Sequence, residues 1–297
     1  MIFVIVGPTG VGKSSLAIEY VQKHGGYIIN GDAFQCYKEM NIGTAKPSLS
    51  ERCLVPHYLF DIATVTQAYT IYDYQKDLRA TLDELIKKNK DIVIVGGSGL
   101  YLKSALFDFT LNEVEHSIDM SEYEKMNEEE LYAALKRIDY ESSLNIHPHN
   151  RKRVLRAIQI YLESGNKKSD IIASQKHKAL YDVIFIGLSK SSRDELYDLI
   201  NKRVDLMVKD GLIDEVKDLM SKYDHNLRAF QAIGYKELIS ALDNNTSIDD
   251  AIELIKKRTR NYAKRQYTYF NNQLEVNWFN SKQEAIEFME NRRLKWI

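Results

Sequence analysis

The sequence predicts an α/β fold in which helices cover both faces of a parallel sheet. Apolar runs of strand length alternate with segments that carry apolar residues at helical spacing, which is typical of parallel sheets. The runs are residues 2–6, 27–30, 91–95, 182–187 and 276–279. Glycines stand directly after the first three runs. Because such sheets bind ligands beyond the carboxyl ends of their strands, we expect one site built from these loops.

The first run leads into the most specific motif of the chain. Residues 7–14 fit the pattern G-x-x-x-x-G-K-[ST] and precede a helical stretch, which is the context of a phosphate-binding loop. The glycines let backbone N–H groups face a polyphosphate, Lys13 reaches the terminal phosphates, and Ser14 can hold a magnesium ion. The expected phosphate ligands are Gly7, Pro8, Thr9, Gly10, Val11, Gly12, Lys13 and Ser14. The motif predicts a P-loop NTPase-like core, and the alternative is an ordinary strand–turn–helix corner.

The next two loops contribute Asp32 and Ser98. Asp32 follows the run 27–30, where it could act as a general base, hold a metal ion through water, or merely cap a turn. Ser98 lies among the glycines of 96–99, where its hydroxyl could donate to a pyrophosphate oxygen or simply occupy a tight turn. The run 91–95 does not end in an acidic residue, and the chain has no Asn-Lys-x-Asp signature. These absences from the sequence disfavour a motor ATPase or a GTPase.

Residues 111–145 interrupt the alternation of strands and helices. They are acidic, mostly helical in pattern, and contain no strand-like run. We therefore expect a helical insertion at 111–145 in a core made of residues 1–110 and 146–297. Helical patterns also cover 71–88, 147–162, 192–220, 234–242 and 247–270, and Ser192 has the signature of a helix N-cap.

Two basic zones stand out in a chain whose net charge is −1. Residues 151–156 place arginines and a lysine on a predicted helix, and residues 258–265 interleave basic residues with a tyrosine. Cations mixed with aromatic rings suit a nucleic-acid surface, where rings stack on bases and cations meet phosphates. Solvated faces of amphipathic helices would give the same pattern.

The composition predicts a folded cytoplasmic protein. A chain of 297 residues with 44% hydrophobic residues is long enough to bury a large core. No apolar run has membrane-spanning length, and the N-terminal residues fit a first strand rather than a signal peptide. The two cysteines have neither metal-ligand nor disulfide spacing, which suits a reducing compartment. Because no heptad seam indicates a dimer, we expect a monomer without a membrane partner.

Several segments carry a resemblance that covers nearly the whole chain. They are 7–14, Gly31-Asp32 with Gln35 and Tyr37, 40–47, 55–61, 96–101, His147-Pro148 with Arg153 and Arg156-Ala157, 232–235, and Arg260 with Lys264-Arg265-Gln266. In this order they resemble the tRNA dimethylallyltransferases, also called tRNA isopentenyltransferases. The Ile-Gly-Thr-Ala-Lys-Pro segment at 42–47 and the Pro-His segment at 56–57 are more specific than the phosphate loop.

The resemblance implies prenyl transfer rather than phosphoryl transfer. Members of this family move a dimethylallyl group from dimethylallyl diphosphate to N6 of the adenosine 3′ of the anticodon in tRNA, and pyrophosphate leaves. By resemblance, Lys13 and a Mg²⁺ ion on Ser14 neutralise the leaving group. Asp32 would accept a proton from the attacking amine or orient it, and Ser98 would donate to the bridging oxygen.

The resemblance also implies a surface for the tRNA anticodon stem-loop. The helical insertion would clasp this stem-loop, and the target base would leave the stack to reach the site. The residues expected to bind tRNA are Asp32, Ala33, Phe34, Gln35, Lys152, Arg153, Arg156, Tyr235, Lys236, Arg258, Arg260, Lys264 and Arg265.

The chain departs from the family pattern in three places. Ala33 stands where serine is common, and Ser98 stands where threonine is usual, which keeps the hydroxyl. No residue of 111–145 could be matched to the arginine that relatives place near the reacting groups. The alternative activities are an adenylate dimethylallyltransferase, which uses the same donor with a free nucleotide, and a P-loop small-molecule kinase. A nucleotide-gated binding module is the non-catalytic alternative.

Overall fold

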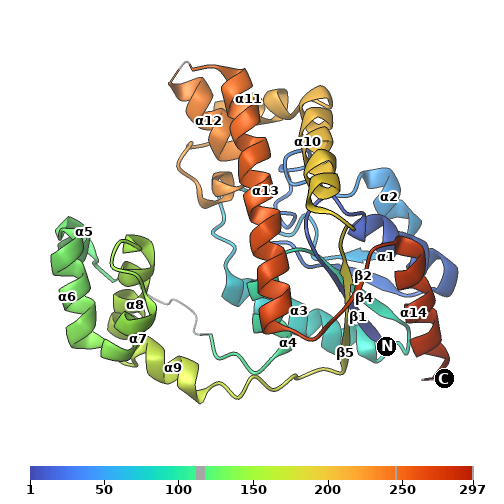
Figure 1. Cartoon of the computed structure of the whole chain (residues 1–297), viewed down its shortest axis with the longest axis horizontal. Helices are drawn as coiled ribbons and strands as arrows, with labels where there is room; N and C mark the ends of the chain where they lie inside the picture. The colour runs from blue at the N-terminus through green and yellow to red at the C-terminus, as the bar shows by residue number, and fades with distance from the viewer. Residues whose placement is uncertain (112–117, 245, 296–297) are drawn as a thin grey trace. The chain divides into compact units, whose positions relative to one another are not determined.

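The computed structural model describes residues 1–111, 118–244 and 246–295. The chain forms two compact units (Figure 1). The first unit contains residues 1–106 and 181–297, and the second contains residues 107–180. Within the described residues, no helix has both the length and the apolar character that crossing a membrane requires.

A parallel sheet organises the first unit. Over the described residues its strand order is β3-β2-β4-β1-β5-β6, and every neighbouring pair is parallel. The strands are β1 (Ile2–Val6), β2 (Tyr27–Asn30), β3 (His57–Tyr58), β4 (Ile92–Val95), β5 (Val183–Leu188) and β6 (Val276–Phe279). This confirms the predicted fold class. Strand β3 was not predicted, because two residues are too short to show a period.

Helices cover both faces of this sheet (Figure 1). Phe3 and Ile5 of β1 pack against α1 and α14, and α3 with α4 lies against the opposite face. The helices of the unit are α1 (Lys13–His24), α2 (Leu49–Leu54), α3 (Ile71–Ile86), α4 (Gly99–Leu106), α10 (Arg193–Lys209), α11 (Leu212–Lys222), α12 (Tyr235–Asp243), α13 (Ile248–Gln273) and α14 (Lys282–Leu294), with a 3₁₀ turn at Arg228–Gln231. The predicted cap is confirmed, because Ser192 Oγ accepts the Glu195 N–H at 3.1 Å and so begins α10.

A second apolar core joins the helices that follow β5. It contains Val204 of α10, Leu212 and Val216 of α11, and Ile255 of α13. Gly211 has φ 101°, a left-handed conformation that lets the chain leave α10 and begin α11 after one turn. This core fixes α10 and α13 beside the carboxyl ends of the strands, where the candidate site lies.

The second unit has a core of its own. Its helices are α5 (Ser121–Lys125), α6 (Glu128–Ile138), α7 (Tyr140–Asn145), α8 (Arg151–Ser164) and α9 (Lys168–Ser174). Leu131 and Leu135 of α6 pack with Val154 and Ile158 of α8. The buried Asp139 accepts the Ser142 N–H at 3.0 Å and the Ser169 hydroxyl at 2.7 Å, which joins α7 to α9.

This unit is larger than the predicted insertion at 111–145. Among the described residues, helix α8 supplies three of the seven that are buried in the core of this unit, so residues 146–180 group with the insertion rather than with the sheet. Phe107 and Ala179 form an antiparallel bridge where the chain enters and leaves the unit. Helix α8 also begins at Arg151 instead of near 147, because Asn150 caps it and residues 147–150 form a turn.

Candidate active site

Two cavities meet at the carboxyl ends of the strands in the first unit. The P-loop cavity, of about 550 Å³, is lined by the phosphate loop, by residues 44–47 and by α10. The apolar cavity, of about 460 Å³, is lined mainly by apolar and aromatic side chains of the loops after β2 and β4 and of α10, α11 and α13. The residues that line both cavities are Thr9, Asp32, Thr44, Gly97, Arg203, Tyr262 and Gln266. We call these residues the shared wall.

The phosphate loop has the local structure that its motif predicts. Gly7 has φ 133°, and a Cβ there would lie 2.2 Å from the Leu188 carbonyl oxygen, so only glycine fits against β5. Lys13 begins α1 and donates to the Gly7 and Pro8 carbonyl oxygens at 3.0 and 2.7 Å. Burial lowers the pKa of the Lys13 ammonium to about 7; repulsion by Arg203 adds to this, and Asp32 opposes it. The loop therefore offers a cation and a helix N-terminus to an anion.

Asp32 follows the end of β2 and lies within the electrostatic influence of Lys13 and Arg203. Its N–H donates to the Asn30 side-chain oxygen at 2.9 Å, and its Oδ1 accepts the Phe34 N–H at 2.9 Å. These two bonds fix the carboxylate on the shared wall. Burial raises the pKa of the Asp32 carboxyl, against the opposing effects of the Phe34 N–H and the Lys13 charge. A carboxylate with a raised pKa is a stronger base than an ordinary aspartate.

Ser98 joins the loops that follow β2 and β4. Its Oγ accepts the Ala33 N–H at 3.0 Å, and its own N–H donates to the Gly31 carbonyl oxygen at 3.3 Å. Ser98 lines the apolar cavity next to Gly97 of the shared wall. Because the Ala33 N–H occupies one lone pair of Oγ, the hydroxyl proton remains available to an acceptor in the cavity.

Arg203 was not predicted as a site residue. It lies on α10 and lines both cavities, where Lys13 and Asp32 are its charged neighbours. Burial lowers the pKa of Arg203, and the charge of Asp32 opposes this. The resemblance implies such an arginine within residues 111–145, whereas the structure supplies one from α10. Nothing in the local sequence distinguishes Arg203 from a surface residue of an amphipathic helix.

The structure brings most of the expected residues of the first unit to these cavities. Ala33, Phe34 and Arg265 line the apolar cavity, and Gln35 lines the P-loop cavity. The Gln35 side-chain amide donates to the Thr44 and Ala45 carbonyl oxygens at 3.0 and 3.2 Å. It thereby fixes the 42–47 segment that the sequence singled out.

The structure corrects the prediction that the side chain of Tyr235 contacts tRNA directly. Its side chain is fully buried against Gly43, and its hydroxyl donates to Glu215 at 2.5 Å. The same carboxylate accepts the N–H groups of residues 41–43. Tyr235 therefore supports the loop that forms one wall of the apolar cavity.

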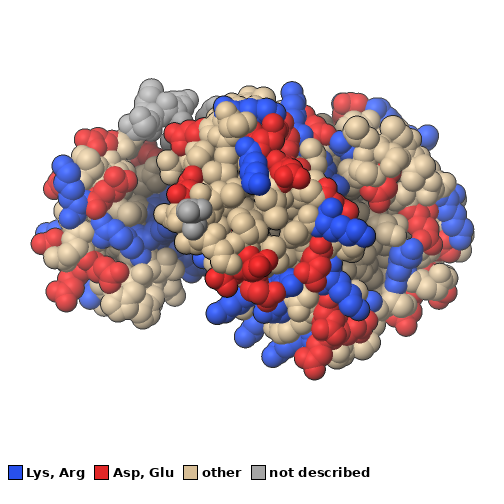
Figure 2. All heavy atoms as spheres, turned by 90° about the horizontal axis from the view of Figure 1, so that it is seen from above, with Lys and Arg blue, Asp and Glu red and all other residues tan. Residues whose placement is uncertain are grey.

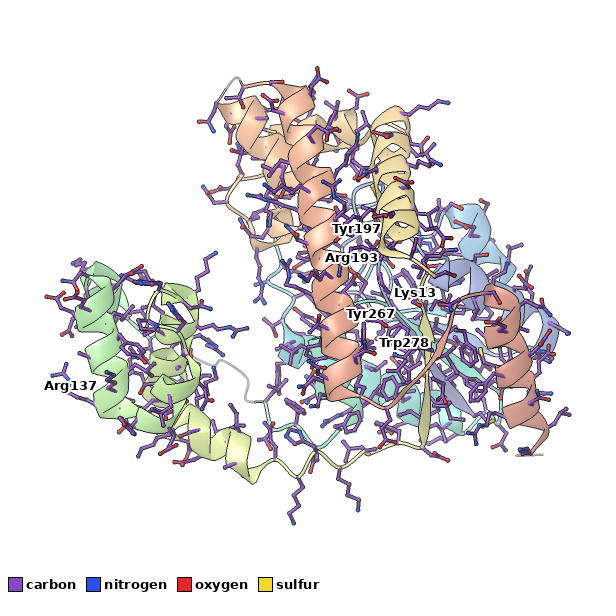
Figure 3. The ribbon with its side chains drawn as sticks, in the orientation of Figure 1. Lys13, Arg137, Arg193, Tyr197, Tyr267 and Trp278 are labelled. Carbon is purple, nitrogen blue, oxygen red and sulfur yellow. The ribbon has the colours of Figure 1, made fainter. Side chains whose placement is uncertain are left out.

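The basic residues near Tyr235 differ in how they are held. Arg258 pairs with the buried Glu237 at 2.6 Å, and Lys236 lies 3.9 Å from the same carboxylate. Arg260 of α13 donates to Asn201 at 2.6 Å and lies over the ring of Tyr197. Both partners belong to α10, where Figure 3 labels Tyr197. Lys264 and Arg265 are exposed.

The predicted basic residues of the second unit lie on α8. Lys152, Arg153 and Arg156 are exposed, and Arg156 pairs with Glu163 at 3.3 Å. Burial together with repulsion from Arg153 and Arg156 lowers the pKa of Lys168, so these cations share one face of the unit. On the face of the molecule that Figure 2 shows, blue and red side chains are interspersed, in keeping with the small net charge.

Metal ligands are limited in the part of the chain that the structure describes. No three His, Cys, Asp or Glu side chains converge there in a way that could hold a metal ion. The P-loop cavity does contain the oxygen atoms of Ser14 and Asp32. A hydroxyl or carboxylate beside bound phosphates is a donor set that suits Mg²⁺, which usually keeps several water ligands.

Comparisons with known proteins agree on one family. The family model described as IPP transferase matches residues 35–273. The chain is 40% identical over 294 residues to the tRNA dimethylallyltransferase of Staphylococcus haemolyticus, covering 96% of this chain and 88% of the relative. A crystal structure of a tRNA isopentenylpyrophosphate transferase from Staphylococcus epidermidis aligns with a TM-score of 0.74 and 37% identity over 100% of this chain and 99% of the other. A eukaryotic dimethylallyltransferase solved acting on tRNA aligns with a TM-score of 0.82 and 28% identity over 98% and 79%.

Proposed function

The chain belongs to the IPP transferase family of tRNA dimethylallyltransferases, and on that premise we propose that it transfers a dimethylallyl group from dimethylallyl diphosphate to tRNA. The acceptor is N6 of the adenosine 3′ of the anticodon. One observation carries this assignment: a cation-lined cavity and an apolar cavity meet at Asp32 and Arg203. A diphosphate fits the first, and a prenyl chain beside a planar base fits the second.

From this geometry we infer a role for each reacting group. The bond between the donor's first carbon and the bridging oxygen breaks, and the same carbon forms a bond to N6. Asp32 takes the proton that the amine loses, and pyrophosphate leaves with the bonding electron pair. Lys13, Arg203 and the N–H groups of the phosphate loop stabilise the negative charge that develops there. The Ser98 hydroxyl donates to the leaving oxygen.

We further propose that Mg²⁺ accompanies the diphosphate. Ser14 would hold it, with the remaining ligands from the diphosphate and water. When bound, the ion would supply positive charge at the leaving group. The Asp32 carboxylate stands on the shared wall in the same cavity.

The acceptor side is proposed to bind the tRNA anticodon stem-loop. Ala33, Phe34 and Arg265 face the apolar cavity, and the cations of α8 are exposed on the second unit. The target base must leave the stack of the loop to enter a cavity of this kind. We propose that the protein acts as a monomer in the cytoplasm, where its substrate tRNA is found.

A transfer assay tests the proposed function. Purified protein is given labelled dimethylallyl diphosphate with unmodified tRNA or with AMP, and in a separate reaction it is given labelled ATP with small acceptors. We expect label in tRNA at the adenosine 3′ of the anticodon, and none in AMP. Transfer to AMP alone, or phosphoryl transfer from ATP, would overturn the proposal. The relatives' names support the tRNA acceptor and give no support to these alternatives.

A further inference from the structure

Two side chains of α13 cross the wall between the cavities. Tyr262 and Gln266 stand one helical turn apart, at spacing i and i+4, so they share one face of α13. Both line both cavities. The mechanism derived above uses neither of them.

Gln266 connects three segments that are far apart in the chain. Its side-chain oxygen accepts the Thr9 N–H of the phosphate loop at 3.1 Å, and its amide donates to the Gly97 carbonyl oxygen at 3.0 Å. Only 5% of its surface is exposed. A Cβ at Gly97 would lie 2.0 Å from the Gln266 amide nitrogen, so glycine is required for this contact. The distance between the phosphate loop and the Gly97 turn is therefore set by one side chain of α13.

Tyr262 continues the connection to Ser98. Tyr262 and Ser98 line the apolar cavity together with Gln266, and the side chains of Ser98 and Gln266 lower the pKa of the phenol against the larger effect of burial. Ser98 Oγ in turn accepts the Ala33 N–H at 3.0 Å. Polar side chains thus line the cavity from the loop after β2, through Ser98 and α13, to the phosphate loop. Burial raises the pKa of Tyr262, so the phenol keeps its proton at neutral pH and remains a hydrogen-bond donor.

We propose that Tyr262 and Gln266 are positioning residues for the transfer: Tyr262 orients the Ser98 hydroxyl toward the leaving oxygen, and Gln266 holds the phosphate loop at a fixed distance from it. The inference rests on the proposed function, because the leaving oxygen is that of the prenyl diphosphate. In-line displacement is sensitive to such placement, since small errors in the position of reacting atoms slow a reaction severely. The α13 helix also presents Arg265 to the apolar cavity, so one rigid element spans both substrates.

A double-mutant cycle tests the role of Tyr262. Tyr262→Phe removes only the hydroxyl, and we expect kcat to fall about tenfold while the Kd for tRNA changes by less than about twofold. Because Tyr262 acts through Ser98, the same substitution in a Ser98→Ala background should lower kcat no further. Equal losses of kcat in both backgrounds would show that Tyr262 acts independently of Ser98 and would overturn the proposal.

Tyr20→Phe is the matched control for a buried phenol. Tyr20 donates to Asp91 at 2.9 Å and lines neither cavity. This substitution should lower the thermal midpoint and leave kcat unchanged. A loss of kcat as large as that of Tyr262→Phe would show that any lost phenol contact slows the enzyme, and the positioning role would fall.

Binding of inorganic pyrophosphate tests Gln266 without relying on turnover. Gln266→Met removes both hydrogen bonds, and Gln266→Glu keeps the acceptor for Thr9 but loses the donation to Gly97. We expect both to weaken pyrophosphate binding by about tenfold, with unchanged tRNA affinity. Unchanged pyrophosphate binding in both variants would overturn the role of Gln266. A wild-type protein that binds pyrophosphate but transfers nothing to tRNA would instead contradict the proposed function.

Discussion

The P-loop cavity and the apolar cavity share a wall but are built in different ways. The first takes most of its chemistry from one contiguous segment, residues 9–15, whose backbone conformation is dictated by glycines. The second is assembled from residues of seven separate stretches, between Thr9 and Tyr269 in the chain. A local motif therefore encodes the proposed diphosphate site, whereas only the tertiary fold creates the proposed acceptor site.

This difference implies a division of labour that mutations can test. The P-loop cavity binds through charge and backbone N–H groups, so its variants should change donor affinity and its dependence on pH. The apolar cavity and the exposed face of α13 bind through shape and spread-out cations, so single variants there should have small effects. In the proposed mechanism the shared wall carries the chemistry, so its variants should have the largest effects.

Asp32→Asn should produce the largest change. It keeps the shape and the acceptor for the Phe34 N–H but removes the base, so kcat should fall by about a thousandfold or more while tRNA affinity stays within about twofold. Asp32 must be deprotonated to act as a base, and burial raises its pKa. As the pH is lowered, wild-type kcat should therefore begin to fall at a pH higher than the pKa of an ordinary aspartate. The kcat of Asp32→Asn should not show this fall. Single-turnover rates across pH, with filter binding of tRNA, measure both.

Asp182 offers a matched control for the substitution of Asp32. Asp182→Asn changes an exposed aspartate that lines neither cavity, and it should leave both measurements as in the wild type. Collapse of tRNA affinity in Asp32→Asn with a nearly normal kcat would make Asp32 a recognition residue instead of a base.

Much of the P-loop side was predictable from the sequence because its determinants are local. The motif at 7–14 and the glycines after β2 and β4 specify backbone turns, and the order of strands then brings Asp32 and Ser98 to one edge. The sheet itself followed from buried runs and their spacing. Only the two-residue strand β3 escaped, because its pairing with β2 depends on tertiary contacts.

The apolar cavity could not be predicted in the same way. Arg203 and Gln266 lie on helices whose sequence pattern marks one face as buried, and a polar residue on that face has no local signature of function. Gln266 fell inside a segment of the family resemblance, yet its contacts with Thr9 and Gly97 follow only from the packing of α13. The boundary of the second unit was missed for the same reason, because Val154 and Ile158 bury against α6 rather than against the sheet.

A smaller effect is expected at Lys13, where the P-loop cavity should show its dependence on charge. Burial and Arg203 lower the pKa of Lys13 to about 7, so at pH 8 the free protein holds most of this lysine neutral. Because pyrophosphate favours the ammonium, its binding should be accompanied by proton uptake, and affinity should fall by up to about tenfold per pH unit above 7. Calorimetry in buffers of different ionisation enthalpy measures the protons taken up.

Lys13→Arg separates the lysine from the ligand's own titration. Arginine stays charged throughout this range, so the variant should bind pyrophosphate with less proton uptake than the wild type. The protonation of pyrophosphate itself is common to both proteins and cancels in the comparison. Equal proton uptake by the two proteins would mean that Lys13 is already charged in the free cavity. It would contradict the lowered pKa of Lys13.

The smallest effects are expected on the outer side of α13, where Lys264 and Arg260 make a contrast of their own. Lys264 is exposed, so Lys264→Ala should weaken tRNA binding a few-fold and reduce the slope of log Kd against log salt by about one. Arg260 is held by Asn201 and Tyr197 of α10, so Arg260→Ala should instead loosen the packing of α10 on α13. We expect it to lower the thermal midpoint and to disturb Arg203, with little change in the slope of log Kd against log salt. Filter binding at several salt concentrations, with thermal unfolding of each variant, distinguishes the two. An unchanged slope in Lys264→Ala would remove this side of α13 from the tRNA surface, and Arg265, which lines the apolar cavity, would then be the basic residue of α13 left to contact the anticodon loop.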